Sequence, residues 1–91
     1  MFIEVSESEA KASHNDPASI SRVLSRILKK ECLADRDKEH FWSIGLSTRN
    51  TIRYVELVSL GTLNATLVHP RELFRTAITI GGISAIIVSH N

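Results

Sequence analysis

Cysteine is almost absent from this 91-residue sequence, because Cys32 is the only one. A single cysteine excludes an internal disulfide framework and is typical of a protein in a reducing compartment. Neither a second cysteine nor a helix start marks Cys32 as reactive, so we expect it to pack as a small apolar side chain.

An excess of charge of one sign and long apolar runs are also missing. The 11 Lys and Arg residues against 10 Asp and Glu residues give a formal net charge of +1, which does not indicate a nucleic-acid-binding protein. No apolar run approaches the roughly 20 residues of a membrane-spanning helix. The N-terminus carries Glu4 and Glu7 where a signal peptide carries basic residues. We therefore expect a soluble, cytoplasmic protein without a membrane partner.

The apolar residues that are present, 43% of the chain, are enough for one small globular domain. The first 15 residues are weakly patterned. Phe2 and Val5 fit a short strand, whereas residues 6–15 are polar, and we expect a flexible lead over residues 1–15. The predicted domain then covers residues 16–91.

Asp16 and Pro17 predict the start of a helix. Aspartate accepts backbone N–H bonds at the N-cap, and proline suits the first helical position. The apolar residues that follow lie at helical spacing along one stripe: Ile20, Val23, Leu24, Ile27 and Leu28, with Leu33 a candidate to extend it.

Alternation in the middle of the chain predicts an antiparallel hairpin. Residues 39–47 place Trp42, Ile44 and Leu46 on one face and mostly small residues on the other, which we expect another backbone to approach closely. A charged connector at residues 34–38 precedes this strand. A turn at residues 48–51, with Asn50 suited to a left-handed conformation, joins it to a partner strand at residues 52–60.

The last third of the chain predicts a helix and a strand. A break at residues 61–64 and a short extended piece at residues 66–68 precede a helix that opens at Pro70 and ends at Gly81. Its apolar side comprises Leu73, Phe74, Ala77, Ile78 and Ile80. Residues 83–89 are almost continuously apolar, which is typical of a strand covered on both faces. Together these elements predict an α/β sandwich.

The order of these motifs resembles the RadC family of bacterial proteins, whose domain belongs to the JAB/MPN (JAMM) metalloprotease superfamily. The resemblance implies the N-terminal part of a JAB/MPN (cytidine-deaminase-like) α/β sandwich at residues 16–91. It rests on four segments: Glu39-His40-Phe41, Ser59-Leu60-Gly61-Thr62-Leu63-Asn64, Val68-His69-Pro70-Arg71-Glu72-Leu73-Phe74, and Ile86-Ile87-Val88-Ser89-His90-Asn91.

The resemblance also implies a chemistry. In such domains a His-x-His-Pro-Ser-Gly segment and a later aspartate hold Zn²⁺, an upstream glutamate acts as general base, and a serine helps to stabilise the oxyanion. Carried over by position, His90 is the first zinc ligand and Glu39 is the general base. The implied reaction is hydrolysis of a peptide or isopeptide bond, so the expected partner is a peptide or protein substrate.

The sequence departs from the family pattern because it ends at Asn91, before the second histidine, the serine and the aspartate. His14 lies in the polar lead, His69 precedes a helix-opening proline, and His40 points to the opposite face of its strand from Glu39. We therefore expect the 91-residue chain neither to hold zinc tightly nor to hydrolyse an amide. Without the resemblance, the sequence favours the interpretation of His90 and Glu39 as ordinary polar residues at strand ends.

Two further hypotheses remain open at this point. One is a non-catalytic interaction module associated with DNA repair, which binds DNA or a protein partner through a basic helix face made of Arg22, Arg26, Lys29 and Lys30. The other is self-association, because an exposed apolar strand at residues 83–89 is a template for pairing with another chain.

Overall fold

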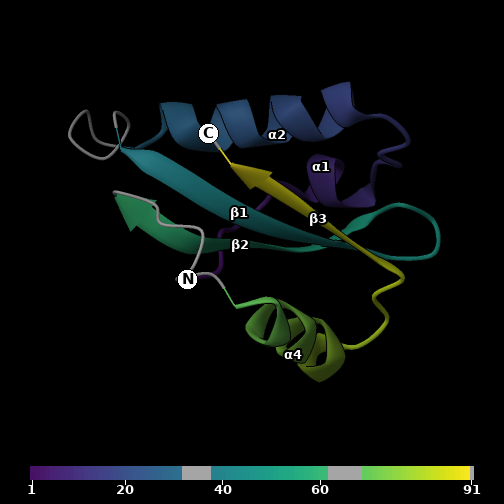
Figure 1. Cartoon of the computed structure of the whole chain (residues 1–91). Coiled ribbons are helices and arrows are strands. Elements are labelled where there is room, and N and C mark those ends of the chain that lie inside the picture. The colour runs from purple at the N-terminus through teal and green to yellow at the C-terminus, as the bar shows by residue number, and fades with distance from the viewer. Residues whose placement is uncertain (32–37, 62–68, 91) are drawn as a thin grey trace.

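The computed structural model describes residues 1–31, 38–61 and 69–90 of the chain. Their elements form a three-stranded sheet in the order β2-β1-β3, with both strand pairs antiparallel. Helix α2 lies on one face of the sheet and helix α4 on the other (Figure 1). The predicted mixed α/β class is confirmed. The elements in chain order are α1 (Glu7–Lys11), α2 (Pro17–Lys29), β1 (Glu39–Leu46), β2 (Ile52–Gly61), α4 (Pro70–Ile80) and β3 (Ala85–His90).

Helix α2 begins where the sequence predicts. The Asp16 carboxylate accepts a hydrogen bond from the backbone N–H of Ser19 at 2.8 Å, and Pro17 follows at the first helical position. The residues that α2 buries, Ile20, Val23 and Ile27, join a core made with the sheet. The sheet contributes Trp42, Ile44, Leu46, Ile52, Val55 and Leu57 to that core.

The hairpin of β1 and β2 has the predicted turn, in which Asn50 adopts a φ of 60°. The pairing places Ile44 opposite Val55 and Gly45 opposite Tyr54, with two irregularities in register. We expected a backbone to approach the small-residue face, and this was wrong. The Tyr54 ring covers Gly45 instead, so closely that a Cβ at position 45 would lie 2.2 Å from the Tyr54 Cε1 atom.

Helix α4 and strand β3 are less covered than the sequence predicts. The helix ends before Gly81, which has a φ of 78°, but it buries only Ala77 and leaves Phe74 59% and Ile78 80% exposed. Strand β3 begins at Ala85 rather than at residue 83, and Val88 is 51% exposed. No residue of β3 is buried in the described part of the chain, so the expected cover on both faces is absent there.

The N-terminal stretch is ordered around the opposite edge of the sheet. Phe2 forms a bridge with Glu56, and the backbone N–H of Ile3 donates to the Val55 carbonyl at 2.8 Å. Helix α1 follows, in the stretch where we expected no element. Ser6 caps it, and the Ser6 and Glu9 side chains bond each other's backbone N–H groups. This reciprocal cap stabilises a single turn that is too short to show apolar periodicity.

Several predicted features lie outside the described residues. They are the packing of Cys32, the possible extension of the apolar stripe to Leu33, most of the charged connector, the break at residues 62–64 and the extended piece at residues 66–68. Strand β2 itself continues through Gly61, one residue beyond the predicted end.

Candidate functional site

The two residues assigned to a site by the resemblance approach each other in the structure. Glu39 is the first residue of β1 and His90 is the last residue of β3, and these strands run antiparallel side by side. The His90 Nε2 atom lies 3.6 Å from the Glu39 Oε2 atom. The two side chains are 49% and 53% exposed, so both are accessible to a solute. The strand ends therefore bring an imidazole and a carboxylate together on the surface.

The ring of Phe41 lies next to the imidazole of His90. Phe41 pairs with His90 in the β1–β3 register, and the two ring centroids are 6.4 Å apart at an angle of 37°. An aromatic neighbour limits the positions that the imidazole can adopt. Because the carboxylate and the imidazole are half exposed, their direct attraction is screened and contributes little to stability.

His40, the next residue along β1, lies on the opposite face, as predicted, and is fully buried. Its Nε2 atom is 2.7 Å from the Glu31 Oε2 atom, and its ring stacks on Trp42 with centroids 5.4 Å apart. Within the described residues, His40 Nδ1 has no hydrogen-bond partner. The contact links Glu31, two residues after the end of α2, to His40 at the start of β1.

The sequence did not identify His40 as a positioning residue. The available signal was its place in the alternation with Trp42 and Ile44, which puts a polar ring on an apolar face. A buried histidine needs a partner, but the sequence does not indicate that Glu31 is that partner, because Glu31 is nine residues away, beyond the end of α2.

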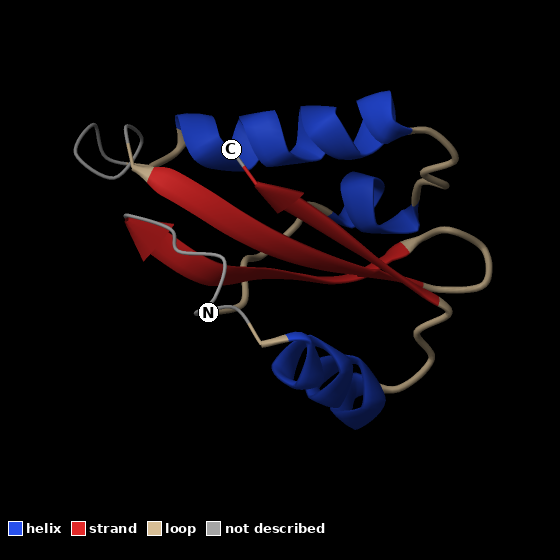
Figure 2. Ribbon diagram, in the orientation of Figure 1, coloured by secondary structure: helices blue, strands red, loops and turns tan. Residues whose placement is uncertain are grey.

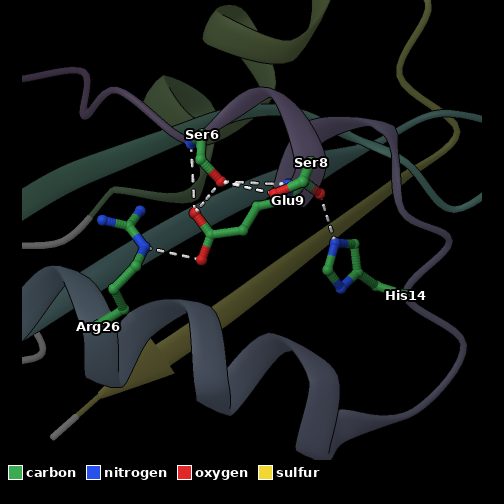
Figure 3. A network of polar contacts seen from close by, with 5 residues as sticks. All are labelled: Ser6, Ser8, Glu9, His14 and Arg26. Carbon is green, nitrogen blue, oxygen red and sulfur yellow. Dashed lines mark hydrogen bonds and ion pairs between the residues drawn. The ribbon is translucent and has the colours of Figure 1, made fainter.

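His14 has a structural role in the loop between α1 and α2, where it is buried. Its Nε2 donates to the Glu9 carbonyl at 2.8 Å, and its Nδ1 contacts the Ser19 hydroxyl. Glu9 also accepts a hydrogen bond from Arg26 Nε at 2.7 Å (Figure 3). Both ring nitrogens of His14 are therefore engaged, and this histidine is not available as a ligand.

The contact between Glu9 and Arg26 also affects the basic face that was predicted to bind DNA. Hydrogen bonding by the Arg26 guanidinium, and then by Ser6, holds the pKa of Glu9 below its usual value despite partial burial. Arg26 is thus committed to a carboxylate within the chain, and its side chain is only 30% exposed. One of the four basic residues predicted to form a DNA-binding face is in an internal ion pair.

His69 and Arg71 are at the start of α4 and are not part of the pair of Glu39 and His90. His69 is the N-cap residue of α4, is exposed, and makes no side-chain capping bond. Arg71 and Glu72 are exposed in the first turn of the helix.

On the face of the sheet that carries Glu39 and His90, two hydroxyl groups are buried. Ser43 Oγ and Tyr54 OH have no hydrogen-bond partner among the described residues. Burial raises the pKa of Tyr54, the nearby Ser43 hydroxyl offsets part of that rise, and the Glu56 carboxylate adds to it. The phenol therefore stays neutral and acts as packing over Gly45.

The described residues do not make a complete metal site. Among residues 1–31, 38–61 and 69–90, no group of three or more His, Cys, Asp or Glu side chains is placed to hold a metal ion. One imidazole and one carboxylate can fill at most two of the four tetrahedral positions of zinc. No helix in the described ranges is long and apolar enough to cross a membrane.

Comparison with known proteins identifies relatives of this chain. The profile of the RadC-like JAB domain matches residues 14–91. UPF0758 proteins are similar in sequence. The one from Desulforudis audaxviator (strain MP104C) is 53% identical over 55 residues, which is 60% of this chain and 24% of that relative. The one from Finegoldia magna (strain ATCC 29328 / DSM 20472 / WAL 2508) is 40% identical over 79 residues, which is 87% of this chain and 33% of that relative.

This chain spans about a quarter to a third of the length of the curated relatives it matches. The match itself covers α2, all three strands and α4, together with both residues of the candidate pair. The chain belongs to the RadC-like JAB domain family.

Proposed function

We propose that this chain forms the N-terminal part of a zinc-dependent metallohydrolase domain, which in its complete form hydrolyses a peptide or isopeptide bond. In this proposal His90 is the first zinc ligand and Glu39 is the general base. The supporting observation is the 3.6 Å approach of His90 Nε2 to Glu39 Oε2 across two strands. The family resemblance assigns both residues to one site, and the fold makes them neighbours.

The proposal concerns the complete domain because the described residues supply only one imidazole and one carboxylate. Further ligands have to come from residues other than those described here. Zinc, when bound, supplies the Lewis acidity that lowers the pKa of water to about 7. The half-exposed Glu39 carboxylate is placed beside the ligand and can accept a proton from solvent.

The alternative, a non-catalytic DNA-repair module that binds DNA or a protein partner, stays a prediction. The engagement of Arg26 with Glu9 at 2.7 Å reduces the basic face on which it rests. No contact in the described part of the chain favours it over the hydrolase proposal.

A chimaera provides the test, in which this chain replaces the matching segment of the Finegoldia magna relative. We expect the chimaera to bind zinc and to hydrolyse peptide or isopeptide bonds. Glu39→Gln should keep the zinc and lower kcat/KM by about 100- to 10,000-fold, the range for loss of a general base. His90→Ala should lose the zinc. Metal content is read by mass spectrometry and hydrolysis with a quenched-fluorescence peptide library and an isopeptide-linked substrate.

The matched control is His69→Ala, because His69 is an exposed histidine outside the pair. It should leave zinc content and rate unchanged. Full zinc occupancy in the His90→Ala chimaera would rule out the ligand role. A fully active Glu39→Gln chimaera would rule out the base role, whatever the metal content.

A further inference from the structure

The start of β1 lies beyond an irregularity in its pairing with β2. Phe41 pairs with Ser59, whereas Trp42 pairs with Leu57, so Val58 is an extra residue of β2 at this point. An extra residue disrupts the hydrogen-bond ladder locally and bends the strand that carries it. The first three residues of β1, residues 39–41, are therefore set apart from the regular part of the sheet, and they include Glu39.

His40 is the one buried side chain among residues 39–41. Its ring stacks on Trp42 with an angle of 7° between the two planes, and its Nε2 atom is 2.7 Å from the Glu31 Oε2 atom. A carboxylate only accepts hydrogen bonds, so the ring donates through Nε2–H. Because Nδ1 has no hydrogen-bond partner in the described ranges, the contact with Glu31 is the hydrogen bond that orients this ring there.

Glu31 connects His40 to a well-anchored helix. The backbone N–H of Glu31 donates to the Leu28 carbonyl in the last turn of α2 at 3.1 Å, and α2 is held in the core by Ile27. The end of α2 lies beside the start of β1 (Figure 1). The Glu31 side chain is only 18% exposed, so its contact with the buried ring is less screened by solvent than a surface pair.

The alternation of the strand couples His40 to Glu39. Successive side chains of a strand project to opposite faces, so holding the His40 ring on one face sets the direction in which the Glu39 side chain leaves on the other. Any fraying of residues 39–41 that moved Glu39 away from His90 would also break the contact between His40 and Glu31.

We propose that Glu31 and His40 are positioning residues that hold the Glu39 carboxylate beside His90. In this role, which rests on the proposed function, Glu39 is the general base and neither Glu31 nor His40 touches the substrate. The contacts run from α2 through Glu31 and His40 to the backbone at residue 39. Residues that orient another functional group in this way typically change its activity by about 10- to 100-fold.

Three substitutions of His40 separate its hydrogen bond from its packing. Glutamine carries its amide nitrogen as many bonds from the backbone as Nε2, so His40→Gln can still donate to Glu31. Asparagine carries that nitrogen at the place of Nδ1, so His40→Asn cannot. His40→Phe keeps an aromatic ring against Trp42 but has no donor.

Hydrolysis by the chimaera with the Finegoldia magna relative measures the effect on the base. His40→Asn and His40→Phe should lower kcat by about 10- to 100-fold, with KM and zinc content unchanged, and His40→Gln should recover most of the rate. Glu31→Ala should also lower kcat. Combined with His40→Asn it should lower kcat by less than the product of the two factors, because the same contact is removed twice.

Ile44→Val is the matched control for stability, because it shortens a core side chain on the same strand and the same face as His40. Urea unfolding of each variant identifies conditions in which all are folded, and there Ile44→Val should have the kcat of wild type. If His40→Gln is as slow as His40→Asn, or if His40→Asn and His40→Phe keep the wild-type kcat, the positioning role is overturned.

Amide hydrogen exchange separates this proposal from the hydrolase proposal. In the 91-residue chain, the backbone amides of residues 39–41 should exchange at least about tenfold faster in His40→Asn than in His40→Gln, and those of residues 44–46 should not differ. Equal exchange at residues 39–41 overturns the positioning role even in an active chimaera. A zinc-loaded chimaera without substitutions that hydrolyses nothing contradicts the proposed function instead, and the exchange rates still decide whether His40 holds this end of β1.

Discussion

The two faces of the sheet differ in how deeply their side chains are buried. The face under α2 consists of large apolar side chains that are almost fully buried, among them Trp42, Ile44 and Val55, and it holds the fold together. The other face mixes small residues such as Gly45 with aromatic ones such as Phe41 and Tyr54, and it faces helix α4, which buries only Ala77 (Figure 2). The candidate pair of Glu39 and His90 is on that second face. The comparison indicates that the tightly packed core and the candidate pair lie on opposite sides of one sheet.

The largest expected effect tests this division directly. Ile44→Ala removes a side chain that is 1% exposed in the α2 core, and should lower the free energy of unfolding by about 2–5 kcal/mol. Ile78→Ala is the same chemical change on α4, where the side chain is 80% exposed, and should cost about 0.5 kcal/mol or less. Urea unfolding of both variants measures the difference, and equal losses would mean that α4 is packed as tightly as α2.

A smaller effect should come from the one tightly packed place on the second face. Gly45→Ala puts a Cβ within 2.2 Å of the buried Tyr54 ring, so the ring or the strand has to shift. We expect a loss of about 1–3 kcal/mol, the usual cost of overpacking.

The control for this effect is a double-mutant cycle. In a Tyr54→Ala background, which is itself destabilised, Gly45→Ala should cost much less because the ring is gone. If the Gly45→Ala cost is the same in both backgrounds, the ring is not the cause.

The smallest effect concerns the ion pair between Glu9 of α1 and Arg26 of α2. The pKa of Glu9 is lowered in the folded chain, chiefly by Arg26, so the carboxylate contributes stability above its unfolded pKa of 4.5. That contribution is lost as the pH falls below 4.5 through the lower folded value. Glu9→Gln should cost about 1 kcal/mol at pH 7 and nearly nothing at the acid end of the range.

Stability curves of both proteins between pH 7 and pH 3 provide the measurement. Glu7→Gln is the matched control, because Glu7 is 81% exposed in its pair with Lys11. It should change the curve little. A constant difference between wild type and Glu9→Gln across this range would contradict the ion-pair explanation.

The sequence predicts the elements of this fold well wherever local chemistry decides them. Asp16 and Pro17 locate the start of α2, because aspartate caps the first turn and proline fixes its own φ at a helical value. Asn50 locates the hairpin turn and Gly81 the end of α4, because both residue types tolerate a positive φ. Periodicity likewise identifies the core face of β1. The motif resemblance supplies the pair Glu39 and His90, which the strand pairing makes neighbours.

What the sequence does not predict depends on contacts between distant residues. Nothing local indicates that β3 lies beside β1, that Tyr54 covers Gly45, or that His40 pairs with Glu31. The apolar stripe of α4 predicts burial of Phe74 and Ile78, but a stripe shows only which side of a helix is apolar, not whether anything covers it. The same limit applies to the apolar pattern of β3.

The pairing of the first residues with β2 has a consequence for the order of events during synthesis. The Met1 ammonium donates to the Leu57 carbonyl at 3.2 Å, across a sequence separation of 56 residues. At translation rates of about 5–20 residues per second, Leu57 follows Met1 by about 3–11 s. Residues 1–3 cannot make their hydrogen bonds with β2 before that strand has been synthesised. Residues 1–3 therefore reach their final place only after β2 has been synthesised.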